Sequence, residues 1–186
     1  AENFDPFEII ISVANKYNIS VHAWINPYRI KSESVPYMLS DDNPYILDDS
    51  IGIETDGGIY YDPSDEKARE LIISGVLEIA NNYDIDGIQF DDYFYPTQDE
   101  NFDYEQYGEY VNKVGQISRM SLDNWRIANV NTLICDTYRA IHSLGKNIVF
   151  GVSPQGNIEN NAEIYADVKS WCICKGFVDY ICPQIY

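Results

Sequence analysis

Short apolar segments alternate with longer amphipathic ones along most of this chain. Apolar residues recur at helical spacing in residues 5–17, 62–83, 104–117, 122–144 and 162–175. Compact apolar runs occupy residues 21–25, 87–90, 148–152 and 178–182 and predict four short strands. Because helices separate these strands in the sequence, we expect the strands to be parallel, as in α/β proteins.

Residues 31–57 interrupt the alternation. They are rich in Ser, Asp, Pro and Gly and are predicted to form a loop, which is long for a compact domain and therefore a candidate functional segment. Four strands cannot close an eight-stranded barrel. The pattern therefore predicts that residues 1–186 form a single-domain fragment of a larger α/β structure.

Charge and composition narrow the range of partners. The chain carries 30 acidic and 12 basic residues, a net charge of −18, which argues strongly against binding to nucleic acid and favours a neutral substrate. No apolar run approaches the roughly 20 residues that span a bilayer, so we expect no membrane insertion. The chain opens on Ala1-Glu2-Asn3 without a signal peptide, as a mature or excised segment would.

Polar side chains gather on one face of each predicted strand, at its carboxyl end. Side chains alternate between the two faces of a strand, so apolar residues such as Ala23, Ile88 and Phe150 face the helices. The opposite face carries His22, Trp24 and Asn26; Gln89, Asp91 and Tyr93; Gly151 and Ser153, followed by Gln155 and Asn157; and Tyr180, Cys182 and Gln184. Because parallel strands end at one edge of a sheet, these residues are predicted to share a pocket.

Each of these residues also has a purely structural interpretation. Asp91 and Asp92 follow a buried strand and could simply cap its loop. His22 could be a hydrogen-bonded core histidine, Trp24 a packing residue, and Arg29 a structural partner of an acid. The repetition of the pattern on four strands favours a site over these separate explanations.

Five sequence blocks resemble the bacterial glycosyl hydrolase-like 10 family. They are HAWINPYR (22–29), DGIQFDDYFYP (86–96), DNWRIANV (123–130), FGVSPQG (150–156) and VDYICPQIY (178–186). The resemblance implies the α/β fold of a partial (β/α)8 TIM barrel, of which this chain covers about the third to the sixth βα units. It also implies an exported or lipid-anchored, hence extracytoplasmic, bacterial protein. Some members are implicated in cutting peptidoglycan glycan strands.

The resemblance therefore implies a glycoside hydrolase that acts on a polysaccharide or a peptidoglycan glycan strand. Such enzymes use two carboxyl groups. We expect Asp91 to be the nucleophile or charge stabiliser and Asp92 to act beside it, by raising the pKa of Asp91 through repulsion. The expected substrate-binding residues are His22, Trp24, Asn26, Tyr28, Arg29, Gln89, Tyr93, Gln155, Asn157, Gln184 and Tyr186. A second carboxylate could come from Glu54, Asp56, Glu159 or strands outside this chain.

Two other classes remain open. The chain could belong to a non-catalytic carbohydrate-binding barrel, because no second acid stands out. It could also belong to a metal-dependent hydrolase with His22, Asp91 and Asp92 as ligands, although the expected site uses no metal and no cofactor. An incomplete barrel exposes two strand edges, so we expect self-association of the isolated chain.

Overall fold

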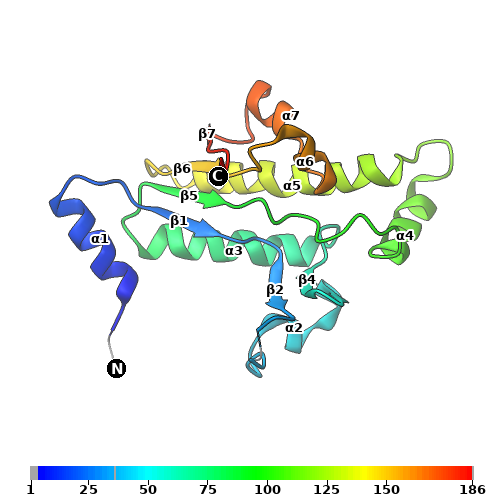
Figure 1. Cartoon of the computed structure of the whole chain (residues 1–186), viewed down its shortest axis with the longest axis horizontal. Helices are drawn as coiled ribbons and strands as arrows, with labels where there is room; N and C mark the ends of the chain where they lie inside the picture. The colour runs from blue at the N-terminus through cyan, green and yellow to red at the C-terminus, as the bar shows by residue number, and fades with distance from the viewer. Residues whose placement is uncertain (1–3, 36, 186) are drawn as a thin grey trace.

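The computed structural model describes residues 4–35 and 37–185. Its main sheet has four parallel strands in the order β1 (His22–Ile25), β5 (Gly87–Phe90), β6 (Val149–Val152) and β7 (Tyr180–Ile181). The four strands have the same order along the sheet as along the chain, with helices between them and three further strands between β1 and β5 (Figure 1). The predicted parallel sheet with crossover helices is therefore confirmed.

Most helices begin where a polar side chain caps the first turn. Asp5 caps α1 (Pro6–Lys16), Asp65 caps α3 (Glu66–Asn82) and Ser121 caps α5 (Leu122–Ser143), each by accepting a backbone N–H bond. A further helix, α4 (Tyr104–Val114), ends at Gly115, whose φ of 81° is easily adopted without a Cβ. These bounds lie within a few residues of the predicted ones.

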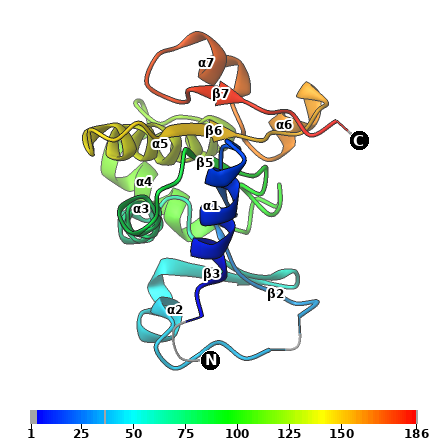
Figure 2. The same ribbon diagram turned by 90° about the vertical axis from the view of Figure 1, so that its left-hand side faces the viewer.

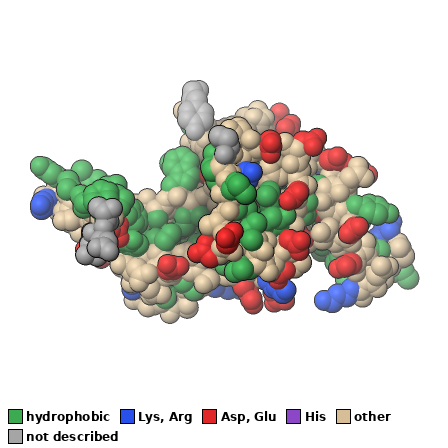
Figure 3. Space-filling model, turned by 90° about the horizontal axis from the view of Figure 1, so that it is seen from below, with side chains coloured by type: hydrophobic (Ala, Val, Ile, Leu, Met, Phe, Trp, Pro, Cys, Tyr) green, Lys and Arg blue, Asp and Glu red, His purple; other side chains and the backbone are tan. Residues whose placement is uncertain are grey.

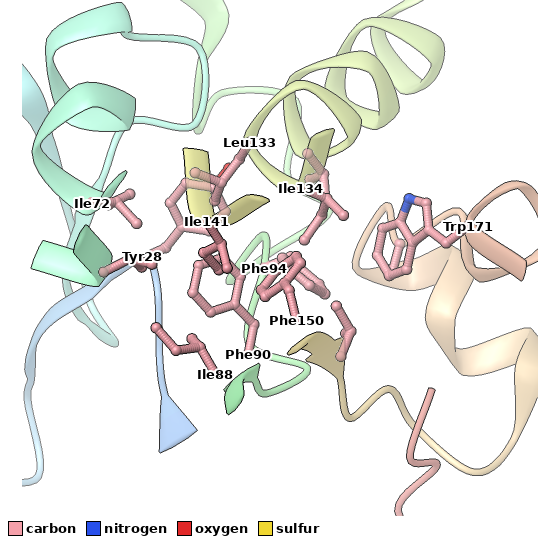
Figure 4. Close-up of a cluster of buried hydrophobic side chains, with 14 of the residues drawn as sticks. Tyr28, Ile72, Ile88, Phe90, Phe94, Leu133, Ile134, Ile141, Phe150 and Trp171 are labelled. Carbon is pink, nitrogen blue, oxygen red and sulfur yellow. The ribbon is translucent and has the colours of Figure 1, made fainter. Parts of the chain in front are cut away.

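The core lies between the main sheet and two helices. The long helices α3 and α5 cover one face of the sheet (Figure 2), and the sheet's apolar side chains pack against them. Ile88, Phe90 and Phe150 lie with Leu133 and Ile134 of α5 in one cluster (Figure 4). The opposite face, here called the inner face, carries His22, Trp24, Gln89, Asp91 and Tyr180.

The prediction that residues 31–57 are loop throughout is wrong, because strands and helices include Lys31, Ser32 and parts of 44–55. An antiparallel sheet in the order β2 (Arg29–Ser32), β4 (Gly58–Tyr61) and β3 (Gly52–Thr55) occupies this region, with α2 (Pro44–Leu47) and a short 3₁₀ helix (Asp49–Ile51). Its strands β2 (RIKS) and β3 (GIET) are mostly polar, so they lack the compact apolar runs that mark the strands of the main sheet. Gly58 permits the turn, with φ 137° and the Lys31 carbonyl oxygen 2.1 Å from where a Cβ would stand.

The helix predicted over residues 162–175 is divided in two. Instead, α6 (Ile158–Glu163) and α7 (Val168–Ile173) are separated at Tyr165, whose φ is 59°. This left-handed conformation cannot continue a right-handed helix. Asp167 then caps the new helix by accepting the N–H of Ser170. The first of the two helices starts four residues before the predicted helix, with Asn157 as its cap.

A buried ion pair fixes the long segment after β5. The guanidinium of Arg126 on α5 and the carboxylate of Asp103 are both fully buried, with Nε donating to Oδ2 at 2.9 Å. Arg126 also donates to the backbone carbonyls of Gln98 and Asp99 and to the hydroxyl of Tyr165. One side chain thereby holds the far end of the segment that begins at Asp91.

Acidic side chains are scattered across the surface drawn in Figure 3. Within residues 4–35 and 37–185, no helix combines the length and apolar character needed to cross a bilayer.

Candidate active site

The carboxyl ends of the four parallel strands lie side by side at one end of the main sheet. Trp24, Gln89, Gly151 and Tyr180 occupy successive positions of one register row across the four strands. The structure therefore brings the predicted polar strand ends together on the inner face. The sheet orients them because its apolar residues are committed to the helices on the opposite face.

A chain of hydrogen bonds crosses the inner face. The Tyr180 hydroxyl donates to Oε1 of Gln89 at 3.2 Å and lies 2.7 Å from Nδ1 of His22. In a flat sheet the strands carrying His22 and Tyr180 would stand roughly 14 Å apart, since neighbouring strands are about 4.8 Å apart. The long side chain of Tyr180 lies across Gly151, and the centroid of its ring is 5.4 Å from that of the His22 ring.

Two glycines make room for these rings. A Cβ on Gly151 would stand 2.2 Å from the Tyr180 ring, and one on Gly87 would stand 2.5 Å from the His22 ring. Burial raises the pKa of Tyr180 to about 12, so its hydroxyl keeps its proton at neutral pH.

A methyl group at position 151 is expected to displace the Tyr180 ring. We expect Gly151→Ala to lower the free energy of unfolding by about 1–3 kcal/mol, because side-chain overpacking costs this much. Gly75→Ala is the matched control: Gly75 lies in α3 with no atom within 4 Å of an added Cβ, so alanine there is expected to stabilise by about 1 kcal/mol. Denaturant unfolding measures both, and equal effects of the two changes would contradict the account.

Asp91 lies just beyond β5 and is 5% exposed. Loss of solvent raises the pKa of its carboxyl above the ordinary value of 3.8. The backbone N–H of Tyr93, the Trp24 side chain and the Arg29 charge oppose this rise, while repulsion from Asp92 adds to it. A carboxyl with a raised pKa beside polar groups is a common feature of catalytic acids.

Asp92 lines a pocket of about 460 Å³ at the same edge. Gln184 also lines this pocket, and its Nε2 donates to Oδ1 of Asp92 at 2.8 Å and to the Ser153 carbonyl at 2.9 Å. The lining residues are Asp92, Tyr93, Gln155, Gly156, Asn157, Asn160 and Gln184. Of the predicted residues, Asp92, Tyr93, Gln155, Asn157 and Gln184 therefore share one cavity.

Two exposed aromatic rings stand beside the acids. Trp24 is 61% exposed and Tyr93 is 56% exposed, and the Arg29 guanidinium lies 4.9 Å above the Tyr93 ring. Oδ1 of Asn26 accepts the backbone N–H of Arg29, whereas its buried Nδ2 has no hydrogen-bond partner in the part of the chain that the structure describes. Exposed flat rings suit the faces of sugars.

One predicted substrate-binding residue, Tyr28, is not part of this arrangement. Tyr28 is 2% exposed and packs edge-to-face on Phe94 in the core, so its expected contact with substrate is corrected to a packing role. It follows Pro27, beyond the end of the strand, where alternation no longer fixes the direction of a side chain. Tyr186 lies outside the described residues.

Other acids considered as a second carboxylate lie elsewhere. Glu54 accepts the Tyr45 hydroxyl at 3.0 Å in the small sheet, and Glu159 lines a different pocket beside α6. Asp56 lies in the β3–β4 turn. No group of three His, Cys, Asp or Glu side chains is arranged to hold a metal ion among the residues described, and His22 contacts Tyr180 instead of the two acids.

Tyr180 and Ser153 were expected in the shared pocket but not as substrate-binding residues, and Gly156 and Asn160 were not expected among them. Alternation did place Tyr180 on the face of Gln184, and this was the available signal. Its importance depends on the bare backbone of Gly151 in the neighbouring strand, which only the strand pairing reveals.

An α/β barrel with acids and amides at its strand ends is the architecture of many glycoside hydrolases. The chain belongs to the Glycosyl hydrolase-like 10 family, whose model matches residues 1–186. It is 34% identical to the glycosyl hydrolase YngK of Bacillus subtilis, covering 98% of this chain and 39% of that protein. It is 31% identical to the glycosyl hydrolase DigH of Escherichia coli K12, covering 98% of this chain and 46% of that protein.

Solved structures show the same fold. The α-galactosidase of Lactobacillus brevis matches with a TM-score of 0.54 at 12% identity, over 97% of this chain and 21% of that one. The GH36 α-galactosidase AgaA of Geobacillus stearothermophilus matches with a TM-score of 0.52 at 12% identity, over 95% of this chain and 21% of that one. The chain is thus a partial α/β barrel that spans less than half the length of the curated relatives it matches.

Proposed function

We propose that the full-length protein hydrolyses glycosidic bonds in a polysaccharide or a peptidoglycan glycan strand, with Asp91 as a catalytic carboxyl. The observation that carries this proposal is the placement of Asp91. It is nearly buried, its pKa is raised, and it stands at the strand ends beside the pocket that Asp92 and Gln184 line. The glycosyl hydrolase names of the relatives in Bacillus subtilis and Escherichia coli support the same activity.

The raised pKa favours one of the two roles open to a carboxyl. Glycosidic cleavage needs an acid that protonates the leaving oxygen and a carboxylate that activates water or attacks the sugar. Asp91 keeps its proton to a higher pH than an ordinary aspartate, which suits the acid better than the nucleophile or charge stabiliser expected from the sequence. The second carboxyl is Asp92 or an acid from barrel units outside this chain.

The surroundings of the acids fit a polymer of sugars. Trp24 and Tyr93 offer flat rings, and Gln89, Gln155, Asn157 and Gln184 offer amides at the same edge of the sheet. We further propose that the described units are about the third to the sixth of the barrel and that the protein works outside the cytoplasm, where such polymers lie.

Product analysis tests the activity. Full-length protein is incubated with peptidoglycan glycan strands and with neutral polysaccharides, and new reducing ends are counted and their masses measured. Release of oligosaccharides supports the proposal. Glycan binding without new reducing ends would instead support a carbohydrate-binding barrel, for which the shortage of acids at the site is the motivating observation.

We also propose that the 186-residue chain, produced alone, self-associates. β1 and β7 are the two edges of the main sheet, and the exposed Trp24 lies on its inner face. Unpaired strand edges template pairing with other chains. Light scattering is expected to give a mass above that of the monomer for the chain alone, while the full-length protein serves as the control. A monodisperse monomer of the isolated chain would contradict this expectation.

A further inference from the structure

We propose that Tyr180 is a positioning residue that orients the amide of Gln89 towards a sugar hydroxyl. This inference rests on the proposed function and adds a specific donor to the substrate site. Tyr180 lies on β7 and Gln89 lies two strands away on β5, yet the hydroxyl reaches the amide oxygen at 3.2 Å. To make this contact, the tyrosine side chain must cross the intervening strand β6.

Gly151 leaves room for the tyrosine ring to cross β6. It lies on β6, between the strands that carry Tyr180 and Gln89, and it pairs directly with both residues in the register. With no Cβ there, the tyrosine ring lies across the bare backbone of β6; a Cβ would come within 2.2–2.5 Å of three ring carbons. The ring position is therefore built into the sheet and does not depend on a flexible surface contact.

The directions of the hydrogen bonds follow from the chemistry of one hydroxyl. Tyr180 has a single hydroxyl proton, which it donates to Oε1 of Gln89. Its oxygen can then only accept a bond from Nδ1 of His22, 2.7 Å away, so the proton of a neutral His22 ring stands on Nδ1. The chain of bonds thereby fixes the tautomer of His22 as well as the amide of Gln89.

A fixed amide oxygen also fixes the amide nitrogen. With Oε1 held by Tyr180, the two N–H donors of Gln89 point away from that bond, on the face that carries the exposed ring of Trp24. Trp24 and Gln89 are direct partners in the register of β1 and β5. A sugar packed on the indole would find an oriented donor at its edge, without the entropic cost of ordering a mobile amide.

The first test removes the hydroxyl oxygen of Tyr180. In the full-length protein, Tyr180→Phe is expected to raise KM for a glycan about tenfold and to leave kcat within about threefold, because a positioned donor of substrate binding is lost. Nitrogen NMR of labelled histidine is expected to show that His22 loses its Nδ1–H tautomer. Tyr104→Phe, at an exposed tyrosine of α4, is the matched control and should change neither measurement.

A second variant removes the amide donors of Gln89 but keeps its hydrogen bond with Tyr180. Gln89→Glu keeps oxygen atoms that accept from Tyr180 but removes both N–H donors, so it should also raise KM while the His22 tautomer stays on Nδ1. An unchanged KM in either variant overturns the positioning role. If the wild-type protein binds glycan without cleaving it, the proposed hydrolysis fails, and Kd replaces KM in both comparisons with the same expected changes.

Discussion

Replacing Asp91 by asparagine is expected to lower kcat for glycan cleavage by the full-length protein by about 10²–10⁴-fold, with a smaller change in KM. This range is the usual contribution of a positioned acid or base. Asparagine keeps the size and the hydrogen bond from the Tyr93 backbone but has no transferable proton. Steady-state kinetics on a defined oligosaccharide measures the effect.

The raised pKa of Asp91 predicts how this substitution changes the pH dependence of stability and of activity. The pKa of Asp91 is higher in the folded state than in the unfolded chain. The protonated carboxyl therefore favours folding below about pH 4, and this contribution to stability is lost as the pH rises through the raised pKa. At neutral pH the asparagine variant should therefore be at least as stable as the wild type. Activity that depends on the protonated acid should fall as pH rises through the same pKa, and Asp91→Asn should lack this limb.

The matched comparison is Asp92→Asn at the neighbouring position. Asp92 accepts a hydrogen bond from Gln184 at the edge of the pocket. Asp92→Asn also removes one negative charge, so comparing the two variants separates the effect of lost charge from the effect of losing the buried acid Asp91. Wild-type turnover in Asp91→Asn would remove this residue from the chemistry. A large loss of stability at neutral pH would show that Asp91 has a structural role instead.

The second large effect is expected on stability, at the buried ion pair. Asp103→Asn leaves the guanidinium of Arg126 fully buried without its counter-charge, and breaking such a pair typically costs about 3–5 kcal/mol. Arg126 also holds the carbonyls of Gln98 and Asp99, so the segment that begins at Asp91 should loosen and activity should fall as well. Denaturant unfolding of the full-length protein measures the loss.

An exposed ion pair supplies the control for this prediction. Lys67 and Asp48 lie 2.9 Å apart with side chains 68% and 43% exposed, so Lys67→Gln should destabilise the protein far less than Asp103→Asn. If Asp103→Asn cost no more than Lys67→Gln, burial of the Asp103–Arg126 pair would not govern the stability of this segment.

The main sheet could be predicted because its strands carry an unambiguous pattern. The bounds of β5, Gly87–Phe90, agree with the structure because apolar residues stop at Asp91 and glycine stands at the other end. The same alternation placed Asp91, Gln89 and Trp24 on one face. Local periodicity is sufficient wherever one face of a strand is committed to a core.

What could not be predicted depends on contacts between distant residues. The strands of the small sheet pair with one another and pack apolar residues such as Ile30 and Ile59 on distant segments, and Tyr165 breaks a helix whose apolar spacing was continuous. Arg126 and Asp103 are 23 positions apart, and nothing in their spacing reveals an ion pair. The direction of Tyr28 depends on packing against Phe94 rather than on its position after a strand.

The most direct test of the account is a crystal structure of the full-length Asp91→Asn variant with a bound oligosaccharide. The account predicts a sugar ring against Trp24 or Tyr93 and a glycosidic oxygen within hydrogen-bond reach, about 2.6–3.2 Å, of the side chain at position 91. An oligosaccharide bound away from the ends of the four strands, without contact to position 91, Asp92 or Gln184, would contradict it.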